Sequence, residues 1–343
     1  MRRTARPSAD RHPSRRPFGK HPPLAVSLIL LGLGTFLLVL APMLAWYVQP
    51  RAAVNPVDID TTAIYTGTGK VFDVEKVRTV PGRRITVTQR VRGDVADSER
   101  SGRAVWDVTT TVDTDQSLPA ADPHDALEFM PHRWVTDRRT NTPVHCCREK
   151  PHIEGEAYLK FPFDVQKRDY RWWDNSLGAA VTLHYRDTRK VQGYEGYRFT
   201  GTVPATRTGT RLVPGAVVGL PERSQVHAEE WYANHLVELV VDQSTGRVLY
   251  ARVGPRKTLR APGAAKDAAV LLDSEKLAFT PRTQREQVRL AKTESGRLRM
   301  LGRTLPTGSA VLGFVLAATG AVLVLRGRAR PDPSGSSPST LTR

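Results

Sequence analysis

Two uncharged apolar stretches, one near each end of the chain, constrain the fold more than any other feature. Residues 24–48 read LAVSLILLGLGTFLLVLAPMLAWYV and residues 305–325 read LPTGSAVLGFVLAATGAVLVL. The hydrocarbon core of a bilayer is about 30 Å thick, and a helix crosses it with roughly 20 apolar residues. A helix also satisfies its own backbone hydrogen bonds, which lipid cannot do. We therefore predict two transmembrane helices over these ranges.

The first stretch has the basic leader of a secretory signal peptide, but it is longer than the apolar region of about 7–15 residues that such peptides contain. Trp46 and Tyr47 close it, as aromatic residues do at a membrane interface. This pattern favours an uncleaved anchor over a cleaved signal. The second stretch is rich in small residues, which let membrane helices approach closely. These small residues have two alternative explanations: the two anchors pack on each other, or the segment has ordinary membrane-helix composition. The residues are Gly308, Gly313, Ala317, Ala318 and Gly320.

Lysine and arginine in the short terminal segments predict the orientation. Residues 1–23 carry seven such side chains against Asp10, and residues 326–343 carry four against Asp332. The positive-inside rule places both segments in the cytoplasm and the middle of the chain outside the plasma membrane. Basic residues just before the second span, from Lys292 to Arg303, point the other way, but the rule gives long translocated segments little weight. We expect both terminal segments to be disordered.

The composition limits the classes of partner that the chain is expected to bind. The formal net charge is +17 and 40% of the residues are hydrophobic. A basic chain commonly binds nucleic acid, but an extracytoplasmic domain rarely meets it, so we expect an anionic membrane surface or an acidic envelope polymer instead. Arginine outnumbers lysine, which is typical of a GC-rich genome such as an actinobacterial one. Base composition is therefore an alternative explanation of the positive charge. The roughly 255 residues between the spans are enough for one sizeable core or two small ones.

The middle of the chain has the pattern of β-strands. Residues 85–92 and 104–112 alternate apolar and polar side chains, which predicts half-buried strands. We expect the polar sequence GDVADSERSG between them to form a turn. Further strands are predicted at 133–136, 181–191, 194–203, 235–253 (with a hairpin turn at 242–246) and 268–279. The β-rich domain thus covers 49–280, and Thr280-Pro281 predicts the N-cap of a helical stalk over 281–304.

An internal repeat is visible at an offset of about 100 residues, over about 85–147 and 181–253. Val91-Arg92-Gly93 corresponds to Val191-Gln192-Gly193, and each copy reaches an Asp-x-x-Thr turn, at 137–140 and 242–245. This predicts a mainly β fold of two similar antiparallel modules that form a curved sheet or partial barrel. Chance likeness of two hairpins is the alternative. Strands that are short and charged, together with two helical anchors, do not suit a one-chain transmembrane barrel.

No motif of catalysis is present, because no nucleophile is paired with a base, and we predict neither an enzyme nor a cofactor or metal. Cys146 and Cys147 are the only cysteines. His145 precedes them, but three contiguous residues do not converge easily on zinc. A vicinal disulfide is one interpretation, although adjacent Cα atoms, about 3.8 Å apart, lie below the usual range for a disulfide and predict a strained, reducible bond. Packing of two small residues at a hairpin end is the other.

Two segments are candidates for contact with a ligand or a membrane. Residues 159–173 interleave aromatic and basic side chains, although Phe161 and Phe163 share a strand face that also suits a plain core strand. We expect Trp172 and Trp173 to point to opposite faces, so that one of them contacts a partner. Residues 211–223 form an apolar segment with Pro and Gly, either a lid or a buried connection. The candidate residues are Phe161, Phe163, Tyr170, Trp172, Trp173, Leu212, Val213, Val217 and Leu220.

Several of these strings together resemble the actinobacterial porin PorA family, also known as the DUF3068 domain. They are GLGTFLLVLAPMLAWYV, TGTGKVFD at 66–73, VRGDVAD, AVWDV, the Cys146-Cys147 pair, LKFPFDVQKRDYRWWDNSLG at 159–178, VPGAVVGLPE at 213–222 and VDQSTGRVLY. The resemblance covers roughly residues 24–326, and its family name implies a cell-wall channel. From the residues themselves we predict a non-catalytic envelope protein that binds or passes an amphipathic component. A channel formed by oligomerisation and an envelope sensor are the alternatives.

Overall fold

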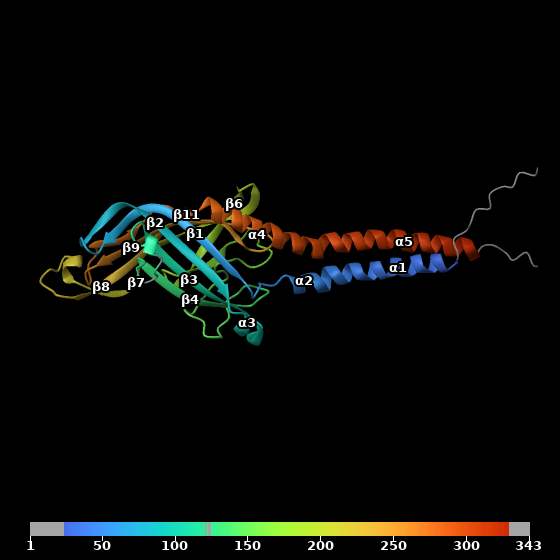
Figure 1. Ribbon diagram of the computed structural model, residues 1–343, viewed down its shortest axis with the longest axis horizontal. Coiled ribbons are helices and arrows are strands. Elements are labelled where there is room, and N and C mark those ends of the chain that lie inside the picture. Colours follow the sequence, from blue (N-terminus) through green and yellow to red (C-terminus); the bar gives the residue numbers. More distant parts are fainter. Residues whose placement is uncertain (1–23, 121, 123–124, 329–343) are drawn as a thin grey trace, which may run out of the picture. The chain divides into compact units, whose positions relative to one another are not determined.

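The computed structural model describes residues 24–120, 122 and 125–328. The disorder predicted for residues 1–23 lies outside the described residues, as does that for 329–343. Residues 326–328, which were also expected to be disordered, instead continue the second apolar helix. The chain divides into two compact units, one that contains the apolar helices near both ends and one that spans Val48–Leu301. Figure 1 labels the elements of both units.

The helical unit pairs the two predicted spans. Helix α1 (Leu24–Met43) continues through a π-helical turn, Leu44–Val48, into the short α2 (Gln49–Ala52), and α5 covers Leu305–Arg328. Both apolar segments are long enough to cross a bilayer, so the chain is a membrane protein with transmembrane helices.

Glycines set the contact between α1 and α5. A Cβ atom on Gly34 would lie 2.3 Å from the backbone nitrogen of Ala317, and one on Gly320 would lie 2.6 Å from that of Leu31. Such separations leave no room for a side chain, so the two backbones touch. Gly308 has no neighbour within 4 Å of such an atom. Of the two interpretations of the small residues, packing of the anchors is therefore confirmed for Gly313, Ala317 and Gly320.

The second unit is a mainly antiparallel β domain, as predicted. Its strands lie in the order β4-β3-β2-β1-β10-β9-β8-β7-β6-β5, and β11 pairs with β1 and β9. The sheet is open, not a closed barrel. The strands are β1 (Asp60–Asp73), β2 (Arg78–Gly93), β3 (Ala104–Thr114), β4 (Glu128–Thr136), β5 (Tyr170–Asp174), β6 (Ala179–Val191), β7 (Tyr194–Val213), β8 (Val226–Val241), β9 (Val248–Arg260), β10 (Ala269–Asp273) and β11 (Leu277–Phe279).

Three expectations about this domain are wrong. The strands are longer than predicted, since β7 has 20 residues and β2 and β8 have 16 each. Register shifts along β7 and β8 break their alternation, which hid their full length. Residues 95–101 form helix α3 (Val95–Ser101) in place of a polar turn, because Asp94 caps it and Gly102, at φ 69°, ends it. The single strand predicted at 268–279 is two strands, β10 and β11. Strands β1 and β5 had no prediction.

The two modules of the proposed repeat have matching topology. Strands β1–β4 form one consecutive antiparallel meander and β5–β8 form another. Each ends in the predicted turn, in which an aspartate accepts a hydrogen bond from the threonine amide three residues later. Asp137 Oδ1 lies 3.0 Å from the nitrogen of Thr140, and Asp242 Oδ2 lies 2.8 Å from that of Thr245. Gly246 takes φ 73°, as predicted. The duplication itself stays a prediction.

The segment 143–161 covers both outer strands of the sheet. Lys150 exchanges two backbone hydrogen bonds with Arg133 of β4, and the backbone oxygen of Ala157 accepts one, 2.9 Å long, from Trp173 of β5. Aromatic rings fill the space between them, with Trp134 5.6 Å from Tyr158 by ring centroids. Unpaired strand edges invite aggregation, and this segment occupies them.

Helix α4 (Pro281–Arg299) begins at the predicted cap, where the Thr280 hydroxyl accepts a hydrogen bond from Thr283. It is more than a stalk, because Val288 and Ala291 are buried against Val240 and Leu249 of the sheet. Val240 alternates with Leu239 and Val241, which belong to the main interior cluster. Helix α4 therefore covers the outer face of strands β8 and β9.

A candidate ligand cavity inside the curved sheet

A cavity of about 200 Å³ lies on the inner side of the sheet. Successive side chains of a strand point to opposite faces, so one residue in two reaches the interior. The walls are mostly apolar and come from strands far apart in the sheet order, which means that the strands curve around a shared space. Val87 of β2, Val112 of β3, Leu239 of β8, Val253 of β9 and Phe279 of β11 are among the lining residues.

A few polar side chains interrupt this wall. Lys257 Nζ lies 2.6 Å from Glu128 Oε2, and both side chains are less than one-fifth exposed. The Tyr232 hydroxyl donates to Asp174 Oδ2 at 2.9 Å and accepts from Asn234 Nδ2 at 3.1 Å. Burial, and next the Asp174 carboxylate, raise the pKa of Tyr232 well above its usual value, so the phenol stays protonated. These groups pair with one another, which satisfies their charges inside an apolar space.

Thr110 is different, because its buried hydroxyl oxygen has no hydrogen-bond partner among the described residues. The residue lines the cavity and is 7% exposed. Buried polar groups are nearly always paired, and an unpaired one costs about 1–3 kcal/mol. The cavity thus presents an unused hydroxyl to whatever occupies it.

A smaller cavity of about 80 Å³ adjoins the first, and the two share Gln89, Leu159, Val248 and Phe279 as lining residues. Lys160 reaches this second space. Burial lowers the pKa of Lys160 to about 7, and the nearby Arg247 guanidinium adds to the effect. Its amine donates to Asn55 Oδ1 at 2.6 Å.

The predicted contact residues of 159–173 fall into two groups. Trp172 and Trp173 both line the larger cavity. As expected, the two side chains point to opposite faces of β5, Trp172 toward the cluster of Phe161 and Phe199 and Trp173 toward Trp134 and Tyr158. A partner for one of them stays a prediction. Phe161 and Tyr170 are core residues that pack against Phe199, with ring centroids 4.9 and 5.6 Å from that of Phe199. The Lys160 amine lies over the ring of Phe163, 4.0 Å from the centroid of that ring.

Residues of the 211–223 segment lie outside the described linings of both cavities. Strand β7 extends to Val213, and a 3-10 turn follows at Gly215–Val218. Val213, Val217 and Leu220 pack against a separate cluster around Val218 and Leu259. Leu212 is 52% exposed. The segment is a packed connection between β7 and β8.

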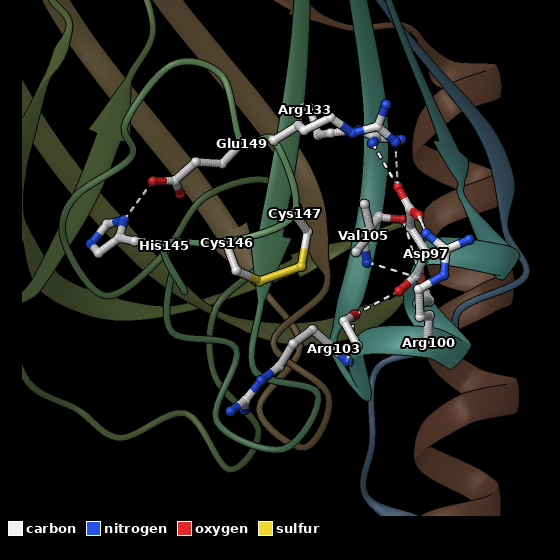
Figure 2. The surroundings of a disulfide bond; sticks show 12 residues. Asp97, Arg100, Arg103, Val105, Arg133, His145, Cys146, Cys147 and Glu149 are labelled. Carbon is white, nitrogen blue, oxygen red and sulfur yellow. Dashed lines mark hydrogen bonds and ion pairs between the residues drawn. A yellow bond between two sulfur atoms is a disulfide. The ribbon is translucent and has the colours of Figure 1, made fainter.

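The sulfur atoms of Cys146 and Cys147 are bonded to each other. Figure 2 shows the pair in the loop after β4, with His145 turned toward Glu149 on the same loop. Neither cysteine lines the cavities described above.

Sequence reasoning missed the polar residues of the cavity, among them Thr110, Glu128, Asp174, Tyr232, Asn234 and Lys257. Glu128 and Lys257 are 129 positions apart in the chain, so only the fold brings them together. A signal was present in β9, where Lys257 follows Val253 and Pro255 at every second position of one strand face. A charged residue at an inward position indicates that it has a buried partner, but it does not indicate which residue that partner is.

Comparison with known proteins supports the family resemblance. Residues 26–322 match the family model Porin PorA, which includes the β domain and most of both apolar helices. A comparison with curated proteins finds no match. Because the family model covers most of the sequence, the chain belongs to the porin PorA family.

Proposed function

We propose that the β domain binds an amphipathic, lipid-like envelope molecule in its cavity while the two transmembrane helices hold the domain at the membrane. The observation that carries this proposal is the largely apolar cavity, lined by residues from both modules and by Trp172 and Trp173. Ligand sites are typically concave and apolar with a few placed polar groups. The family match supports a porin-like, channel-type membrane protein without catalysis.

The polar groups define the kind of ligand. Lys257 already has a carboxylate partner in Glu128, and Asp174 is occupied by Tyr232. A charged head group would therefore enter with no free counter-charge, which is costly in an apolar space. The buried Thr110 hydroxyl is one group left to bond. We therefore infer a ligand with an apolar chain and an uncharged head that carries hydroxyl or amide groups.

Tryptophan quenching tests this. Full-length protein in mild detergent is titrated with a brominated monoacylglycerol, whose bromines quench tryptophan at short range. We expect saturable quenching, which Val87→Phe weakens by about tenfold or more because the new ring fills the cavity. Thr88→Phe is the matched control, since Thr88 is the next residue on the same strand and faces the opposite side. Absence of saturable quenching, or equal effects of the two variants, would contradict the proposal.

Thr110→Val separates binding from folding. The valine keeps the shape and removes the unpaired hydroxyl, so the ligand-free protein becomes more stable by about 1–3 kcal/mol. Affinity for the monoacylglycerol falls, whereas affinity for a brominated fatty-acid methyl ester, which lacks hydroxyl groups, stays the same. A variant that loses both ligands equally would show that the hydroxyl has no part in recognition.

The orientation is part of this proposal. We place both terminal segments in the cytoplasm and the β domain outside the plasma membrane, because lysine and arginine gather in the short termini. A membrane-impermeant thiol reagent checks this orientation in intact cells. Two single-cysteine variants are labelled, Ser8→Cys and Ser117→Cys, each in a Cys146→Ser/Cys147→Ser background. Labelling of Ser8→Cys in intact cells would contradict this orientation.

A channel formed by several copies is the second candidate, and the family name is what favours it. Transmembrane barrels need a closed ring of strands with an apolar outer face, whereas this sheet is open and its outer face carries α4. A pore would therefore have to form between copies. A sensor that signals to the terminal segments is the third candidate, and a cytoplasmic partner that binds those segments would support it.

A further inference from the structure

We propose that the loop after β4 holds a divalent transition-metal ion, Zn²⁺ or Cu²⁺, between His145, Glu149 and His152. One possible ligand atom from each of these residues lies within 4.8 Å of the other two. Two imidazoles and a carboxylate are ligands that zinc and copper accept, whereas Mg²⁺ and Ca²⁺ prefer oxygen alone. The site is separate from the lipid cavity and does not depend on it.

The Glu149 carboxylate already brings the two imidazoles together. The Nδ1 atoms of His145 and His152 lie 2.8 and 3.0 Å from the same oxygen, Glu149 Oε1. The two rings are stacked, with centroids 3.8 Å apart and planes inclined by 17°. A tetrahedral zinc ion with ligands at about 2.1 Å holds those ligands roughly 3.4 Å apart. Each nitrogen needs to move about half an ångström away from the carboxylate oxygen, and the exposed rings need to turn so that both nitrogens face one ion.

The backbone holds this loop in place. Lys150, next to Glu149, is paired with Arg133 of β4, and the amide of Glu149 donates to the backbone oxygen of Cys146 at 3.0 Å. The Glu149 side chain is 14% exposed, whereas those of His145 and His152 are 50% and 62% exposed. The carboxylate is thus fixed inside and the imidazoles face solvent. An ion would keep at least one position open for water, as in sites with three protein ligands.

Neighbouring charges do not oppose the ion strongly. Arg148 lies in the same loop, but its guanidinium is 2.8 Å from Asp97 Oδ2. Arg133 also contacts Asp97, at 2.9 Å, and it binds Asp94 and Asp107 as well. Figure 2 shows Arg133 directed toward Asp97 and not toward Glu149. These cations are therefore largely balanced before any metal arrives.

The sequence did not predict this site, since we considered only His145 with the two adjacent cysteines. The spacing His145-x3-Glu149-x2-His152 lies in a loop with no regular period, so it carried no sign that the three side chains meet. Cys146 and Cys147 are bonded to each other and are not part of the proposed site.

Equilibrium dialysis of untagged full-length protein in detergent, without reductant, tests the proposal with ZnCl₂ and CuSO₄, and with MgCl₂ as a negative control. We expect one Zn²⁺ or Cu²⁺ per chain. His152→Ala and Glu149→Gln each weaken binding more than about 100-fold, because even outer-shell partners of a metal are worth 10–100-fold. His184→Ala is the matched control, since His184 forms a similar exposed contact, 2.8 Å from Asp169, without a third ligand. It should bind the ion as the unaltered chain does.

Three outcomes would overturn the proposal. The first is no binding by the unaltered chain, and the second is an equal loss in His184→Ala. The third is binding that survives in Glu149→Gln but is lost in Cys146→Ser/Cys147→Ser, which would assign the ion to the thiols. Circular dichroism of each variant checks that it has folded.

Discussion

Lys160 shows at the scale of a single residue how burial changes a charged group. The side chain is 7% exposed, and its amine contacts the Asn55 oxygen and the face of Phe163, neither of which carries charge. Desolvation is the main reason that its pKa falls to about 7; Glu294 and Asp242 oppose this decrease, and Arg247 contributes to it. A protonated lysine therefore destabilises the fold at neutral pH.

The consequence for stability has a definite sign. The pKa of Lys160 is lower in the folded chain than its ordinary 10.5, so between about pH 7 and 10.5 the unfolded chain binds more protons. The free energy of unfolding should rise with pH in this window, by up to about 1.4 kcal/mol per pH unit. Thermal melts in detergent at pH 7 and 9 should show a midpoint that rises by several degrees. Lys160→Met should lose this rise, and Lys190→Met, at an exposed position, should keep it. Identical pH dependence in all three proteins would refute the assignment.

At the scale of elements, the pair of transmembrane helices depends on a few glycines. Lipid provides no hydrophobic force between helices, so close backbone packing has to hold them together. Gly34 of α1 and Gly320 of α5 leave no room for a Cβ atom, whereas Gly32, on the same helix as Gly34, has nothing within 4 Å of that position. The contact is thus confined to one face of each helix.

We expect Gly34→Leu to separate the helices and Gly32→Leu to leave them paired, since overpacking costs about 1–3 kcal/mol. The thermal unfolding midpoint of the full-length protein in lipid nanodiscs reports the pairing. Gly34→Leu should lower this midpoint, whereas Gly32→Leu should leave it unchanged. Equal midpoints for the two variants would mean that the helix pair tolerates the added volume.

At the scale of the whole molecule, the open sheet bears on the choice between a binding domain and a pore. Its inner face surrounds a cavity and its outer strands are covered by residues 143–161, so one chain has no closed wall to line an aqueous channel. Purified monomer in a planar bilayer should therefore give no discrete conductance. Reproducible conductance steps from an oligomer of defined mass would instead favour the channel that the family name describes.

Local chemistry by itself determined a large part of this protein. Length and apolarity predicted the two spans, alternation predicted that the middle is β, and the Asp-x-x-Thr turns and the Thr280 cap depend only on neighbouring residues. The family resemblance also came from the sequence alone, and the family model confirms it. Helix α3 and the full length of β7 were missed, because a short capped helix and a bulged strand carry no clear period.

The tertiary structure decided the sites. Glu128 and Lys257 are 129 positions apart, and Asn55 and Lys160 are 105 apart, so their contacts exist only once the strands have paired in register. The same holds for Thr110, whose lack of a partner is a property of its surroundings and not of its neighbours in the chain. His145, Glu149 and His152 are close in sequence, but an irregular loop brings them together only where its backbone is bound to β4. Local pattern determines which elements form, and long-range pairing determines which side chains meet.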